Sequence, residues 1–289
     1  MAAGSTDVPR CRSPLRLRTR LYPESVTLVM GVLNVTPDSF SDGGCWYDYQ
    51  RAVDHALTLV REGADVVDVG GESTRPGASP VDEAEECRRI LPVIEAVAAS
   101  GIRVSVDTRK ASVAKAAVKA GATLINDVSA ALWPVAAEEG VGWVAMHMRG
   151  EPRTMQVDPH YDDVVTEVRD FLIERATRAT AAGVSEVWID PGIGFGKTQE
   201  HNLKLLRHLD RLVETGVPVA IGTSRKTFLG RLTAAADSGD GQPTPADDRL
   251  EASLASAVWA MTKGAAMLRV HDVGPTTEAV RLAQDRVSA

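Results

Sequence analysis

The sequence is poor in cysteine and in long hydrophobic runs, and it carries no excess of positive charge. Its 289 residues include three cysteines (Cys11, Cys45 and Cys87) with no C-x-x-C pair, which argues against a disulfide framework or a thiolate metal site and favours a reducing, cytoplasmic location. No apolar stretch approaches the roughly 18 residues of a membrane span. A net charge of −7 predicts neither nucleic acid nor an anionic membrane as a partner.

The first residues differ in composition from the rest of the chain. Five arginines occur in the first twenty residues, without the apolar run of a signal peptide. We predict a flexible Arg-rich tail over residues 1–24, with a transit peptide as the alternative. Residues 25–289 contain no linker and are predicted to form a single domain, in which the polar stretch 237–248 joins two helical pieces.

After Ser25, short β-branched runs alternate with longer helical stretches to the end of the chain. Eight runs are predicted as strands, at 28–34, 65–70, 103–107, 123–127, 143–147, 187–190, 219–222 and 267–271. They are almost continuously hydrophobic, as parallel strands buried on both faces are. Eight β/α units in about 250 residues are typical of a TIM (β/α)8 barrel, whereas open doubly wound sheets usually have fewer strands.

The carboxyl ends of these strands are unusually polar. They carry Asn34, Asp68, Asp107, Asn126, Asp127, His147, Asp190, Ser224, Arg225, Lys226, Arg269 and His271. In a TIM barrel this edge holds the reacting groups. Single polar residues there can also be caps, but all eight strand ends share the feature.

The residue types are sorted around the ring of strand ends. Asp107, Asn126 and Asp190 suit the edge of a flat, nitrogen-rich heterocycle. The cations and His271 follow the seventh and eighth strands, where barrels often bind phosphate. Arg225 and Lys226 lie at the start of a predicted helix. Cations are unfavourable there because of the helix dipole, so these two residues suggest a bound anion. A metal site made by Asp68, Asp107, Asp190 and His271 is an alternative.

Two loops are longer than a β/α connection requires, VTPDSFSDGG (35–44) and GGESTRPGA (70–78). They are interpreted as lids that close over a substrate, with Phe40 covering it. The segment DPGIGFGKT (190–198) is similar to a phosphate loop, but Pro191 stands where the Walker pattern needs glycine.

These blocks together resemble dihydropteroate synthase, a family that joins p-aminobenzoate to 6-hydroxymethyl-7,8-dihydropterin pyrophosphate and releases pyrophosphate. The resemblance runs from about Leu28 to about Val273 and rests on MGVLNVTPDSFSDGG (30–44), VDVGGESTRPGA (67–78), SVDT (105–108), INDVS (125–129), MHM (146–148), DPGIGFGK (190–197), TSRK (223–226) and RVHDV (269–273). It implies a TIM barrel, a homodimer, a Mg2+ requirement and sensitivity to sulfonamides.

The resemblance also implies roles for individual residues. Asp107, Asp190, Lys226 and Arg269 would be catalytic. The pterin slot would be Asp107, Asn126, Asp190 and Lys226, with Met146, Phe195 and Arg269 against the ring. The anion pocket would be Asn34, Arg75, Arg269 and His271, with Asn34 also the metal ligand.

The p-aminobenzoate would lie among Phe40, Pro76, Lys226, Thr227 and Ser224, and Asp42 and Thr74 would complete the substrate site.

Two departures from the family pattern are visible. Thr227 replaces a common serine, and INDVSAALWP (125–134) replaces a glycine-rich continuation. The alternatives are a catalytically silent pterin-binding paralogue and a methyltetrahydrofolate methyltransferase. Asn34, Asp42 and Arg75 argue against the first, and the TSRK cluster argues against the second.

Overall fold

The computed structural model of the chain describes residues 27–36, 45–73, 80–237 and 242–287. The proposed tail over residues 1–24 lies outside these ranges. So do five residues of the proposed substrate site: Phe40, Asp42, Thr74, Arg75 and Pro76. The division of the chain into a tail and one domain therefore stays a prediction.

Eight parallel strands form one sheet that curls into a barrel, which confirms the predicted fold class. The strands are β1 (Leu28–Asn34), β2 (Val66–Gly70), β3 (Val104–Asp107), β4 (Leu124–Asp127), β5 (Gly142–Met146), β6 (Val187–Asp190), β7 (Ala220–Ile221) and β8 (Met267–Val270). They are paired in the order β6-β5-β4-β3-β2-β1-β8-β7. A parallel bridge between Ile189 and Val219 joins the two ends of the sheet. The observed bounds lie within one residue of the predicted ones.

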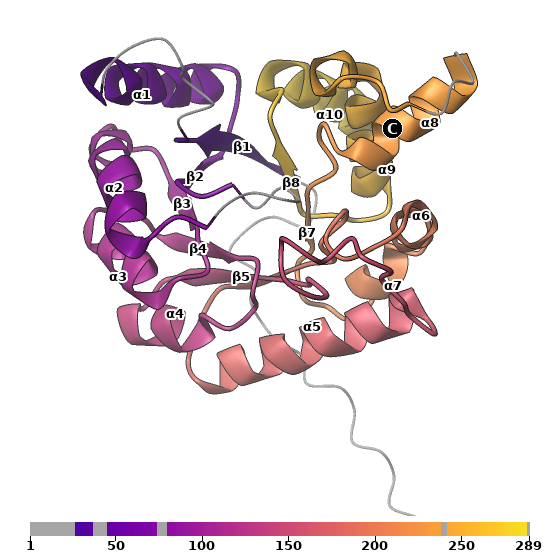
Figure 1. Cartoon of the computed structure of the whole chain (residues 1–289), viewed down its shortest axis with the longest axis horizontal. Helices are drawn as coiled ribbons and strands as arrows, with labels where there is room; N and C mark the ends of the chain where they lie inside the picture. The colour runs from indigo at the N-terminus through magenta and orange to yellow at the C-terminus, as the bar shows by residue number, and fades with distance from the viewer. Residues whose placement is uncertain (1–26, 37–44, 74–79, 238–241, 288–289) are drawn as a thin grey trace, which may run out of the picture.

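The helices surround the strands (Figure 1). They are α1 (Cys45–Arg61), α2 (Glu83–Ala99), α3 (Ala111–Lys119), α4 (Trp133–Glu139), α5 (Val164–Ala181), α6 (Gln199–Arg207), α7 (Asp210–Val213), α8 (Thr227–Asp237), α9 (Leu250–Thr262) and α10 (Val273–Val287), with a short 3-10 helix at Ala246–Asp248. Helices α8 and α9 are the two pieces expected on either side of the polar stretch. None of the helices in the described ranges is long and apolar enough to cross a membrane.

The core has two layers, because successive side chains of a strand point to opposite faces. The larger cluster lies between strands and helices and includes Val67, Ile125 and Ile189. The smaller cluster fills the barrel interior with Leu28, Met30, Val66, Leu124, Val144, Trp188, Ala220 and Met267. The interior layer is apolar, so the polar residues that follow it along the strands meet at the barrel mouth.

Candidate active site

The alternation along each strand decides which polar side chains face the barrel interior. Val66 and Leu124 belong to the interior cluster, so Asp68 and Asn126, two positions further on, share that face. By the same two-residue spacing, Met146, Asp190 and Arg269 share the interior face with Val144, Trp188 and Met267. The register pairs Asp107 with Asn126 and Met146 with Asp190. The strands thus bring the sequence-predicted Asp107, Asn126, Met146, Asp190 and Arg269 to one mouth.

Arg269 is the centre of the polar contacts at this mouth. Its Nε lies 2.6 Å from Asp68 Oδ2 and its Nη2 lies 2.6 Å from Asp107 Oδ2. The Asn126 amide donates to the same Asp68 oxygen at 2.9 Å. Asp68 is fully buried, so one carboxylate fixes both the guanidinium and the amide that were predicted to bind substrate.

Two residues predicted at the strand ends face away from the mouth. Asp127 accepts hydrogen bonds from the backbone of Ala131 and Leu132 at 2.7 Å each and therefore caps the loop before α4. The His147 ring packs against Phe171 at a centroid distance of 5.0 Å. Both residues are one position out of phase with the interior set, which explains their structural role.

On the opposite side of the mouth, the segment after β6 and the start of α8 are in contact. Asp190 Oδ1 accepts a hydrogen bond from Gly192 N at 2.7 Å. Lys226 Nζ donates to the Ile193 carbonyl and lies 4.9 Å from the centre of the Phe195 ring. The structure therefore brings Asp190, Phe195 and Lys226 close together.

Burial shifts the pKa values of the charged groups at the mouth. Desolvation raises the pKa of Asp107 to about 7, since it outweighs the opposing charge of Arg269 and is supported by Asp68. Burial also raises the pKa of Asp190 and lowers the pKa of Lys226 to about 8, while Asp190 and Lys226 partly offset the shift in each other. Burial disfavours the Arg269 cation, but Asp68 and Asp107 reverse this and raise its pKa. The pKa values of Asp107 and Lys226 therefore lie close to neutral pH.

The region expected to bind an anion divides into two parts. Ser224 Oγ lies 3.1 Å from His271 Nδ1 and also accepts from His271 N at 3.2 Å, so these two residues form one corner. Arg225 turns away and forms an ion pair with Asp272, with Nε–Oδ2 at 3.0 Å. The anion predicted from the position of Arg225 is therefore the Asp272 carboxylate of the chain itself. Thr227 is the exposed first residue of α8.

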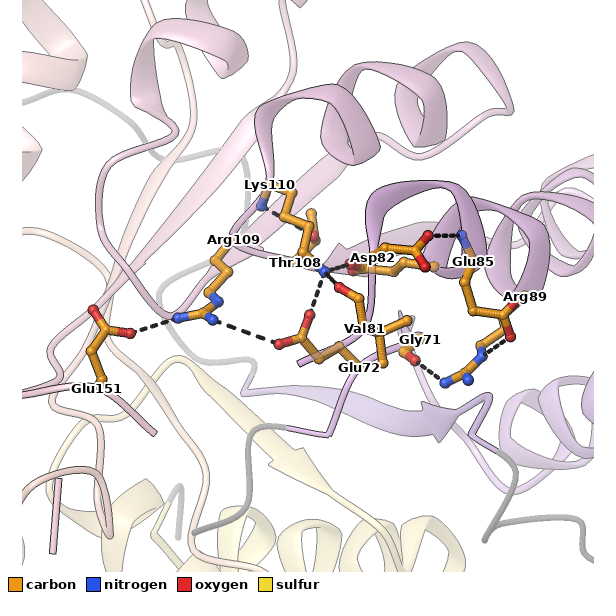
Figure 2. Close-up of polar contacts among 11 residues, drawn as sticks. Gly71, Glu72, Val81, Asp82, Glu85, Arg89, Thr108, Arg109, Lys110 and Glu151 are labelled. Carbon is orange, nitrogen blue, oxygen red and sulfur yellow. Dashed lines mark hydrogen bonds and ion pairs between the residues drawn. The ribbon is translucent and has the colours of Figure 1, made fainter. Parts of the chain in front are cut away.

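A second polar cluster joins three rim segments beside β3 (Figure 2). Lys110 Nζ donates to Glu72, to the Val81 carbonyl at 2.6 Å and to Glu86 Oε2 at 2.5 Å. Arg109, the preceding residue, pairs with Glu151 at 2.8 Å. Residues directly after β3 therefore tie the segments that follow β2 and β5 to the strand that carries Asp107.

The described residues do not make a metal site by themselves. They contain no group of three or more His, Cys, Asp or Glu side chains that could hold an ion. Asn34, at the end of β1, offers one neutral oxygen, and Asp68 and Asp107 are occupied by Arg269. The alternative metal site of Asp68, Asp107, Asp190 and His271 is thus not formed.

Comparison with known proteins agrees with this geometry. Residues 30–271 match the family model described as "Pterin binding enzyme". A dihydropteroate synthase of Mycobacterium leprae is 49% identical over 88% of this chain and 91% of its own length. The chain belongs to the dihydropteroate synthase family. Members of this family are transferases of folate synthesis, so the chain is an enzyme of that class.

Two solved structures of the family extend the comparison. The Xanthomonas albilineans dihydropteroate synthase with 4-aminobenzoic acid is 46% identical, with a TM-score of 0.84 over 92% of this chain and 95% of that one. The same enzyme in complex with 7,8-dihydropteroate is 44% identical, with a TM-score of 0.81 over 93% and 96% of the two chains.

Sequence reasoning did not predict the contacts that three residues make around the barrel mouth. Asp68 was noted as polar, but the sequence does not show that it holds Arg269 and Asn126. Lys110 and Lys197 gave no signal, since a lysine is usually an exposed residue. Lys197 is 2% exposed, and only its place in the motif DPGIGFGK could have drawn attention to it.

Proposed function

We propose that this chain condenses 6-hydroxymethyl-7,8-dihydropterin pyrophosphate with p-aminobenzoate to give 7,8-dihydropteroate and pyrophosphate. The observation that carries the proposal is the barrel mouth, where Asp107, Asn126, Asp190, Lys226 and Arg269 converge from β3, β4, β6, β8 and the start of α8. Membership of the dihydropteroate synthase family supports the same reaction.

The pterin would bind along the polar edge of the mouth. Carboxylates accept from ring N–H and amino groups, and the Asn126 amide offers both a donor and an acceptor. Met146 and Phe195 would pack against the ring. Arg269 forms ion pairs with Asp68 and Asp107, so its guanidinium is held at a fixed position beside the slot.

The pyrophosphate would lie toward the corner made by Ser224 and His271, with Asn34 and Arg269 alongside and Arg75 joining from the loop after β2. The p-aminobenzoate would lie beside Thr227 and Lys226, and we retain Phe40, Asp42, Thr74 and Pro76 as further contacts in this proposal. Cations and backbone donors stabilise such an anion as its charge grows.

The chemistry requires no general base. The aryl amine is neutral near pH 7 and already nucleophilic, so the barrier lies in breaking the carbon–oxygen bond to pyrophosphate. The bonding electrons leave with the pyrophosphate oxygen, the amine nitrogen then bonds to the electron-poor carbon, and the amine proton passes to solvent. Ionised Asp107 and Asp190 would stabilise the positive charge that the pterin carries meanwhile. Closure of the two loops would keep water from capturing it.

The described residues of this chain offer few ligands for a divalent metal. We propose Mg2+, with Asn34 as its ligand from the described residues, because Mg2+ usually keeps several waters and binds through substrate phosphates. Mg2+ alone is then expected to bind weakly and to bind tightly only with pterin pyrophosphate, which calorimetric titration measures.

We also propose a homodimer and a cytoplasmic location. Leu203 on α6 and Trp259 on α9 are 38% and 47% exposed, and Trp259 Nε1 donates to the Leu206 carbonyl of α6 at 3.0 Å. Large exposed apolar residues on two helices in contact favour a partner surface. Sedimentation analysis is expected to give a dimer that W259E shifts toward monomer. The low cysteine content supports the location.

The deciding experiment is release of pyrophosphate by the purified protein with both substrates and Mg2+. Turnover with formation of dihydropteroate is expected. Binding of the pterin without turnover would favour the silent paralogue. Methyl transfer from methyltetrahydrofolate without pyrophosphate chemistry would favour the methyltransferase.

A further inference from the structure

Lys197 is a buried lysine whose contacts are all with neutral groups. It is 2% exposed. Its Nζ lies 2.9 Å from His147 Nδ1 and donates to the carbonyls of His147 at 3.2 Å, Gly192 at 3.0 Å and Phe195 at 3.0 Å. Burial lowers its pKa well below the ordinary value, and the nearby Lys226 charge acts in the same direction. A lysine is costly to bury in this way, so a specific role is expected of it.

The groups that Lys197 contacts lie on two different rim segments. His147 follows β5, whereas Gly192 and Phe195 follow β6. The two segments are in close contact, because a Cβ added at Gly192 would lie 1.9 Å from the His147 carbonyl oxygen and one at Gly196 would lie 2.2 Å from that of Arg149. Both glycines have positive φ, 64° and 62°, so only glycine permits this approach without strain.

The segment held by Lys197 carries three features of the pterin slot. Gly192 N donates to Asp190, the Ile193 carbonyl accepts from Lys226, and the Phe195 ring lies beside Lys226. Two other carbonyls of the segment accept from side chains of the segment after β5: Gly194 O accepts from Gln156 at 2.6 Å and Gly196 O accepts from Tyr161 at 2.8 Å. Lys197 is the donor that holds this segment at two points, Gly192 and Phe195, and also reaches the segment after β5.

We propose that Lys197 is a positioning residue for the pterin slot. It fixes residues 192–195 against the segment after β5, and thereby fixes Asp190, Phe195 and Lys226 relative to one another. Lys197 does not touch substrate in this arrangement. The inference rests on the proposed function only in that the slot takes a pterin; the contacts themselves are independent of it.

The test compares K197M with the matched control K204M. Methionine retains the apolar length of lysine but leaves the three carbonyls without their donor, whereas Lys204 is a surface residue of α6 that pairs with Glu200. We expect K197M to weaken binding of pterin pyrophosphate in calorimetric titration by about tenfold or more, the effect of losing hydrogen bonds that pre-organise a site. The KM for p-aminobenzoate is expected to change much less, and K204M to match the wild type.

Amide hydrogen exchange separates positioning from general stability. Residues 192–196 are expected to exchange faster in K197M at a temperature well below its melting point, while α2 and α3 keep wild-type protection. A merely structural role would lower the melting temperature and leave the pterin affinity unchanged. Folded K197M with wild-type affinity and wild-type exchange over 192–196 would overturn the proposal.

A second variant covers the case in which K197M does not fold. K197Q retains two N–H donors, so it is expected to fold and to weaken pterin binding by about three- to tenfold; wild-type affinity in K197Q would count against the inference. Titration of the wild type comes first. If the wild type does not bind the pterin, the proposed function fails, and the role of Lys197 is still decided by the exchange of residues 192–196.

Discussion

Removing the Asp68 carboxylate tests whether one buried side chain organises the barrel mouth. Its Oδ2 accepts from Arg269 Nε at 2.6 Å and from Asn126 Nδ2 at 2.9 Å, and the residue is fully buried. In D68A both donors lose this acceptor. We expect lower stability and weaker pterin binding, because Arg269 then keeps only Asp107 as its described carboxylate partner.

The magnitude follows from these contacts. Breaking a buried ion pair by removing one partner costs about 3–5 kcal/mol. The Arg269 side chain is 24% exposed and keeps its bond to Asp107, so the lower end applies and D68A is expected to lose about 3 kcal/mol of unfolding free energy. D68N keeps one carbonyl oxygen as an acceptor without the charge, and about half that loss is expected for it.

The assay is urea unfolding combined with calorimetric titration of pterin pyrophosphate. S105A is the matched control, since Ser105 pairs with Asp68 in the β2–β3 register, is fully buried, and has no described hydrogen-bond partner for its hydroxyl. S105A is expected to be close to neutral in both measurements. D68A with the stability and pterin affinity of S105A would refute the view that Asp68 holds Arg269 and Asn126.

Three further predictions concern pH, order of binding and inhibition. The pKa of Asp107 is raised from 3.8 to about 7, so the folded protein binds this proton more tightly than the unfolded chain. The contribution of Asp107 to the free energy of unfolding is therefore present below about pH 4 and is lost as the pH rises to 7. D107N should gain stability relative to the wild type between pH 5 and pH 8 in thermal melts, and a constant difference would contradict the shift. In the proposed site, pyrophosphate and Mg2+ recruit Arg75 and Asp42, so titration should detect p-aminobenzoate binding only with pterin pyrophosphate, or with pyrophosphate and Mg2+; tight binding to the free protein would show otherwise. Sulfonamides, which also present an aryl amine opposite an anionic group, should compete with p-aminobenzoate, and T227A should raise the inhibition constant more than the KM for p-aminobenzoate; an active enzyme indifferent to sulfonamide would rule out this placement of Phe40, Pro76 and Thr227.

The fold and much of the mouth could be predicted from the sequence, because both depend on local periodicity. Continuous apolar runs such as 28–34 and 187–190 define buried parallel strands, and eight β/α units define the barrel. Once the barrel is assigned, a polar residue at a strand end is placed at the catalytic edge. Asp107, Asn126, Asp190 and Arg269 were predicted at the mouth in this way, and the motifs that contain them are typical of the family.

Only the tertiary structure decided which face each polar residue takes and which residues pair across the barrel. Asn126 and Asp127 are neighbours in sequence, yet one joins the mouth and the other caps a loop, because a shift of one residue reverses the side of a strand. Both Arg225 and Arg269 belong to the same polar edge of the barrel. The sequence does not show that Arg225 pairs with Asp272, whereas Arg269 pairs with Asp68. The burial of Lys197 depends on glycines at 192 and 196 that let two loops touch. Such contacts join residues distant along the chain, and they form only when the barrel closes.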